Sequence, residues 1–202
     1  MKKGIKNIRK GILMVAMMAA SLSFANEGAP FYRVANDAKK TALTLAYVKE
    51  GSVLSIKDYY GEVLYKESIK QNGLYAKGFD LTALPSGSYF FELDSDVAFK
   101  VIPFTIKSNT IVYNRDEAKT IYKPITRVKG DLVFVSKLNL SKEPLKVNIY
   151  YQKGDSSDLI MEETISDSEK VERVYKLTGL KSGDYKIVMS TEGKTFTEYI
   201  NN

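Results

Sequence analysis

The segment Leu81-Thr-Ala-Leu-Pro-Ser-Gly-Ser-Tyr89 recurs as Leu177-Thr-Gly-Leu-Lys-Ser-Gly-Asp-Tyr185, with six of nine positions identical at an offset of 96 residues. An alternating apolar stretch precedes each copy, and another follows it. A repeat in matching strand context indicates a duplicated structural unit. The chain is therefore predicted to contain two modules of similar fold.

Both copies have the spacing Leu-x-x-Gly-x-Tyr, which is typical of the tyrosine corner of Greek-key sandwiches. In that motif the Leu enters the core, the Gly permits a turn, and the Tyr hydroxyl bonds to backbone upstream. The residues expected in these structural roles are Leu84, Gly87, Tyr89, Leu180, Gly183 and Tyr185. The alternative for the two tyrosines is that they stack on a ligand.

The rest of the chain is typical of strands. Period-2 alternation, as in Ser52–Asp58, and turn signals every 8–12 residues or so predict an all-β fold. We expect two tandem Ig-like, Greek-key β-sandwich modules. The expected boundaries are 31–107 for the first module, 108–120 for a linker and 121–202 for the second module.

Residues 1–25 are predicted to be a cleaved signal peptide. They contain five basic residues and no acidic one, then an apolar run, and Ser23-Phe24-Ala25 fits a small-x-small cleavage site. The apolar stretch Gly11–Ala25 has 15 residues, fewer than the roughly 20 that a transmembrane helix needs. Without a transmembrane segment after cleavage, the protein is expected to be exported: periplasmic, outer-membrane-associated or extracellular.

Cleavage removes most of the net charge of +6. The mature 177 residues contain 25 basic and 24 acidic residues, so no general basic excess favours nucleic acid as a partner. The chain has no Cys and no His. Disulfides, Cys- or His-ligated metals and nucleophile relays built on these residues are therefore excluded.

Residues 44–106 contain a characteristic set of positions: Ile56, Asp58, Gly61, Val63, Asp80, Leu81, Leu84, Pro85, Gly87 and Tyr89. On these positions the first module resembles the C-terminal sorting domain of the type IX (Por) secretion system of Bacteroidetes. The second module matches more weakly, around Leu177–Tyr185, with Lys176 where the first copy has Asp80. The resemblance implies a compact Ig-like sandwich in a bacterial envelope.

Candidate chemistry is sparse. The pair Asp58 and Asp80 suits carboxylate acid–base work, but strand-end hydrogen bonding is the favoured interpretation. The acidic loops Asp94–Asp96 and Asp155–Asp158 offer oxygen ligands for Ca²⁺, although turn formation explains them better. We therefore predict no catalytic residue, metal or cofactor.

Four tyrosines form the candidate binding surface: Tyr59, Tyr60, Tyr150 and Tyr151. Each pair follows an Ile-containing strand, and one ring of each pair is expected to face inward and the other outward. An outward pair would stack on a protein or a surface glycan. The alternative is an ordinary half-exposed sheet face.

These observations favour a non-catalytic structural or interaction protein of the envelope, with an unknown protein or a surface glycan as its partner. The first alternative is a type IX secretion substrate displayed at the cell surface, with the second module as a degenerate sorting domain. A carbohydrate- or Ca²⁺-binding module is the remaining alternative.

Overall fold

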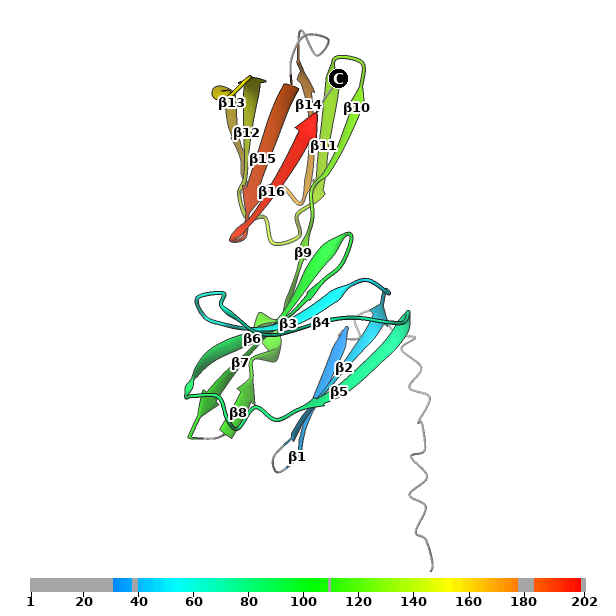
Figure 1. Cartoon of the computed structure of the whole chain (residues 1–202), viewed down its shortest axis with the longest axis vertical. Coiled ribbons are helices and arrows are strands. Elements are labelled where there is room, and N and C mark those ends of the chain that lie inside the picture. Colours follow the sequence, from blue (N-terminus) through cyan, green and yellow to red (C-terminus); the bar gives the residue numbers. More distant parts are fainter. Residues whose placement is uncertain (1–30, 38–39, 109, 178–183, 201–202) are drawn as a thin grey trace, which may run out of the picture. The chain divides into compact units, whose positions relative to one another are not determined.

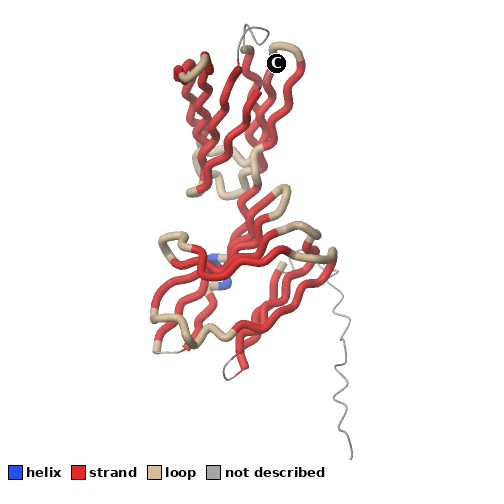
Figure 2. Tube along the Cα trace, viewed as in Figure 1, coloured by secondary structure: helices blue, strands red, loops and turns tan. Residues whose placement is uncertain are grey.

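The computed structural model describes residues 31–37, 40–108, 110–177 and 184–200. Within them the chain is almost entirely β-strand, with a single 3₁₀ turn, η1 (Arg115–Glu117), and no α-helix (Figure 2). This confirms the predicted all-β class. The predicted signal peptide lies outside the described residues, and no helix within them is long and apolar enough to cross a membrane.

The first sandwich consists of two sheets (Figure 1). One sheet has the order β1-β2-β5, and the other has the order β4-β3-β6-β7-β8, with β9 also paired to β7. The strands are β1 (Tyr32–Asp37), β2 (Lys40–Val48), β3 (Val53–Asp58), β4 (Val63–Ser68), β5 (Gly73–Phe79), β6 (Gly87–Asp94), β7 (Ala98–Lys107), β8 (Thr110–Tyr113) and β9 (Lys119–Tyr122).

The second sandwich repeats this topology. Its sheets have the orders β10-β11-β14 and β13-β12-β15-β16. Each of these strands corresponds to the strand of the first sandwich whose number is nine lower, so that β10 matches β1 and β16 matches β7. The nine-residue repeat thus marks a duplication of seven strands. The strands are β10 (Ile125–Lys129), β11 (Leu132–Leu138), β12 (Leu145–Lys153), β13 (Ser156–Ile165), β14 (Lys170–Lys176), β15 (Asp184–Thr191) and β16 (Lys194–Ile200).

The buried apolar side chains form two separate clusters, one in each sandwich. The first cluster is rich in aromatic rings, and the Phe91 ring packs against those of Phe79 and Phe104, with centroids 5.3 and 5.0 Å away. The second cluster is mainly aliphatic and includes Val147, Ile149 and Ile187. Each sandwich therefore has its own core, as the alternation of apolar residues requires.

Residues 108–120, the expected linker, contain strands of the first sandwich. β8 pairs with the C-terminal half of β7 and β9 with its N-terminal half, while η1 lies between them. The point on β7 where its partner changes from β9 to β8 lies near Pro103, which has no N–H to donate to a neighbouring strand. Two residues, Lys123 and Pro124, separate β9 from β10. The division into modules at 107 and 121 stays a prediction.

In the first predicted tyrosine corner, Leu84 is partly buried against the core and Gly87 is the first residue of β6. The Tyr89 hydroxyl donates to the Pro85 carbonyl at 2.9 Å, and the Tyr89 ring stacks on Phe104. A Cβ added at Gly87 would meet this ring at 3.5 Å. In the second copy, Leu180 and Gly183 lie outside the described residues, whereas Tyr185 is buried in the core.

One glutamate in each sandwich joins the two sheets. Glu67 on β4 accepts hydrogen bonds from Tyr75 and Lys77 on β5. Glu163 on β13 accepts from Arg173 and Tyr175 on β14, at 2.7 and 2.8 Å. Both Glu67 and Lys77 recur at the offset of 96, as Glu163 and Arg173, so the repeat extends to this inter-sheet contact.

These glutamates should make the fold sensitive to acid. Burial acts to raise the pKa of Glu67 and Glu163, but hydrogen bonds from their cationic and tyrosine partners outweigh it, so both pKa values lie below the usual 4.5. A carboxyl with a lowered pKa stabilises the fold above its unfolded-state pKa, and this is lost as pH falls through the folded-state pKa. We expect the free energy of unfolding, measured in urea, to decline below about pH 4.5. The decline should be shallower in the double variant Glu67→Gln/Glu163→Gln, and an unchanged slope would contradict this account.

Candidate functional site

Tyr59 and Tyr60 form the exposed tip of the β3–β4 hairpin. Their side chains are 76% and 91% exposed, and the rings meet edge to face with centroids 5.6 Å apart. Asp58 holds the turn, because its carboxylate accepts from the Glu62 N–H at 2.8 Å and its carbonyl accepts from the Gly61 N–H. The expectation that one ring of this pair faces inward was wrong, since both residues lie past the end of β3, where strand alternation does not apply.

Tyr150 and Tyr151 lie within β12 and are half-buried. Lys186 lies over the Tyr150 ring at 4.8 Å, and Tyr151 packs against Tyr185 at 5.3 Å. The partner of Tyr151 on β15 is Tyr185, and the partner of Asp58 on β6 is Tyr89. The two tyrosine pairs therefore occupy different positions in the repeat, and they do not form equivalent surfaces.

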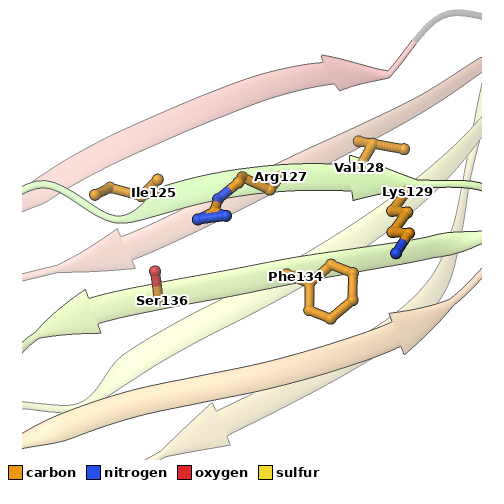
Figure 3. A pocket seen from close by; sticks show the side chains of 6 residues that line it. All are labelled: Ile125, Arg127, Val128, Lys129, Phe134 and Ser136. Atoms are coloured by element: carbon orange, nitrogen blue, oxygen red, sulfur yellow. The ribbon is translucent and has the colours of Figure 1, made fainter.

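A surface hollow also lies on β10 and β11 of the second sandwich (Figure 3). Here an open hollow of about 480 Å³ is bounded by side chains from both strands. We call it the β10–β11 groove. Its lining residues are Ile125, Arg127, Val128, Lys129, Phe134 and Ser136.

The groove combines exposed apolar groups with cationic ones. Ile125 and Val128 are 57% and 49% exposed, and Phe134 is 37% exposed. No carboxylate of the described residues lies within 4 Å of the Arg127 guanidinium or the Lys129 ammonium. Large apolar side chains that stay solvated beside unpaired charges mark an interaction surface more often than a folding requirement.

The first sandwich provides an internal comparison. In the second sandwich, Arg127, Phe134 and Val174 lie side by side across β10, β11 and β14. Because Lys77 corresponds to Arg173, the next residue along each strand also corresponds, and Gly78 matches Val174. The residues paired across the sheet with Gly78 are Ala42 on β2 and Ala35 on β1, and they complete the matching row of the first sandwich. The same sheet face thus carries small residues in one copy and Arg, Phe and Val in the other. A fold that forms with small residues at these positions does not need the large ones.

Sequence reasoning missed this groove for a physical reason. Ile125-Thr-Arg-Val-Lys129 alternates as any half-exposed strand does, and nothing in it distinguishes an open edge from a covered one. The groove could be found by comparing the outward-facing residues of the two sandwiches at equivalent positions. That comparison needs the pairing register of the strands, which the sequence alone does not provide.

The candidate carboxylates are used in turns and ion pairs. Asp80 accepts from the Thr82 N–H and hydroxyl at 3.1 and 2.6 Å, and Asp94 pairs with Lys123 at 2.7 Å. Among the described residues, no group of three or more acidic side chains is arranged to hold a metal ion. Turn formation thus accounts for Asp58 and Asp80 in this structure.

No protein-family model matches this chain, and no curated protein matches it. The solved structures with a weak likeness to this chain include the following three. A biofilm-associated protein BSP domain is 14% identical, with 85% of this chain and 29% of that chain covered and a TM-score of 0.27. The FN1–FN3 domains of chicken CNTN1 are 11% identical, with coverages of 84% and 64% and a TM-score of 0.27. The human OSCAR ligand-binding domain is 10% identical, with coverages of 86% and 97% and a TM-score of 0.25. The chain spans less than two thirds of the first two structures.

Proposed function

We propose that this chain is a non-catalytic exported protein of the bacterial envelope, which binds a partner through the β10–β11 groove. The observation that carries the proposal is the row of Arg127, Phe134 and Val174, where the duplicated sandwich has Ala35, Ala42 and Gly78. Because the fold does not require the larger side chains, their exposed apolar area is available for binding.

The export part of the proposal rests on the signal-like residues 1–25. Its test is mass spectrometry of the protein recovered from fractionated cells. We expect a mature N-terminus at Asn26 in the envelope or the medium. An uncleaved chain in the cytoplasm would overturn this part.

The binding part is tested by placing a photo-crosslinking residue at Val174 in the full chain in cells. The crosslinked partner is identified, purified and titrated against the wild type and against Phe134→Ser. We expect Phe134→Ser to weaken binding by roughly tenfold, since truncating a central aromatic contact costs more than 1 kcal/mol.

Leu64→Ser is the matched control, because Leu64 is 43% exposed on the edge strand β4 of the first sandwich. It should bind the partner like the wild type. Equal weakening by both variants, or none by Phe134→Ser, would refute binding through the groove.

Secretion by the type IX system is the second candidate. The residues that carry the resemblance include Asp80, which caps a turn, and Tyr89, which bonds to Pro85. Both contacts serve the fold, so the resemblance supports the sandwich more directly than it supports sorting. A reporter inserted between residues 25 and 26, ahead of the mature chain, and found only in the periplasm would exclude this candidate.

A further inference from the structure

We propose that the partner presents an extended strand in which carboxylates alternate with aliphatic residues, and that this strand adds to the free edge of β10. This inference rests on the proposed function and specifies the chemistry of the partner. It follows from the backbone of β10, the charges along it and the groove beside it.

β10 is an open edge. It pairs with β11 on one side only, and no described residue forms a hydrogen bond with its other side. Four of its five residues are exposed. An edge strand of this kind has unpaired N–H and C=O groups that an incoming strand can satisfy, as in recognition by β-strand addition.

The side chains of β10 define what the added strand must carry. Opposite residues on neighbouring antiparallel strands lie about 4.5–5.5 Å apart at Cβ, so each faces one defined partner position. Arg127 and Lys129 lie on one face of β10 and favour carboxylates opposite them. Val128 lies on the other face, is 49% exposed, and favours an aliphatic residue. Ile125 favours an aliphatic residue beside the groove.

Read from its N-terminus, an antiparallel occupant would therefore have an acid opposite Lys129, an aliphatic residue opposite Val128, an acid opposite Arg127 and an aliphatic residue opposite Ile125, with the position opposite Thr126 left open. A second copy of β10 does not fit this pattern. Antiparallel pairing of β10 with itself, centred on Arg127, would set two guanidinium groups against each other without a counter-charge. The cations thus disfavour self-pairing and favour an acidic strand.

An anionic membrane surface matches the charges but not the shape. Its phosphates offer no N–H groups to the carbonyls of an open strand edge, and apolar insertion needs side chains that protrude. Phe134, the largest apolar side chain of the groove, lines a hollow and is only 37% exposed. A peptide strand can form hydrogen bonds with the edge of β10, pair its carboxylates with Arg127 and Lys129, and place an aliphatic side chain in the groove.

The test is an NMR titration of the ¹⁵N-labelled protein with two synthetic peptides that contain Thr-Asp-Val-Asp-Val-Leu-Thr or Thr-Lys-Val-Lys-Val-Leu-Thr. We expect the acidic peptide to shift amide resonances of β10 and β11, with an affinity that falls as salt is raised. The lysine peptide should bind at least roughly tenfold more weakly.

The double variant Arg127→Glu/Lys129→Glu should reverse this preference and bind the lysine peptide better. The matched control is Lys66→Glu/Lys70→Glu, which changes the net charge equally at exposed positions in and beside β4. It should keep the wild-type preference. Unchanged melting temperatures of both variants show that the fold is retained.

Equal binding of the two peptides, no reversal in the Arg127/Lys129 variant, or shifts outside β10 and β11 would each overturn the inference. So would binding to phosphatidylglycerol vesicles without binding to the acidic peptide, or dimerisation lost in the Arg127/Lys129 variant. If the partner identified by crosslinking is lost with Phe134→Ser but not with Arg127→Glu/Lys129→Glu, the proposed function stands and the acidic-strand inference fails.

Discussion

Replacing Phe91 by alanine is expected to lower the free energy of unfolding of the first sandwich by about 3–5 kcal/mol. Phe91 is fully buried on β6, and its ring touches the rings of both Phe79 and Phe104. Truncation removes this apolar contact and leaves a cavity among rigid rings that are poorly able to close it. Two separate cores predict that the second sandwich keeps its own transition in differential scanning calorimetry.

The matched control is Ile187→Ala, which removes an equally buried side chain from β15 in the second core. It should destabilise the second sandwich by about 2–5 kcal/mol and leave the first transition in place. If either variant shifts a single common transition, the two sandwiches unfold as one cooperative unit, and the predicted division into modules fails.

The second large effect is expected from Glu192→Ala, which removes the counter-charge of a buried lysine. The Lys137 side chain on β11 is 1% exposed; its ammonium donates to Asn139 Oδ1 at 2.7 Å and lies 3.6 Å from Glu192 Oε1. The Glu192 side chain is itself 3% exposed. Burial lowers the pKa of Lys137 and the glutamate acts to raise it, so the charge of Lys137 depends on Glu192.

Breaking a buried ion pair from one side costs about 3–5 kcal/mol, because the other charge stays buried and uncompensated. We expect a loss of this size in urea unfolding of Glu192→Ala. The double variant Lys137→Met/Glu192→Ala should recover most of it, since removing both charges is close to neutral. Equal instability of the single and double variants would show that Glu192 acts by another route. The exposed Lys119, which lies 3.4 Å from Glu192, contributes little.

Much of the fold could be predicted from local pattern. Alternation in segments such as Leu145–Tyr151 places Leu145, Val147 and Ile149 in the core, and all three are fully buried. The repeat of Leu81–Tyr89 at Leu177–Tyr185 indicates duplication, and the strand orders show it in full. The candidate site was less predictable. Tyr59 and Tyr60 can be recognised in the sequence as adjacent tyrosines, whereas Arg127 and Phe134 lie in strands of ordinary alternation.

By itself, the sequence determined the strand class, the duplication and the inward residues, because side-chain alternation is a local property of a strand. Only the tertiary structure decided which strands have an open edge, because that depends on pairing between segments far apart in the chain. It likewise decided that β8 and β9 pair with β7, whereas β10 pairs on one side only among the residues that the structure describes. The groove and its exposed cations follow from that difference in pairing.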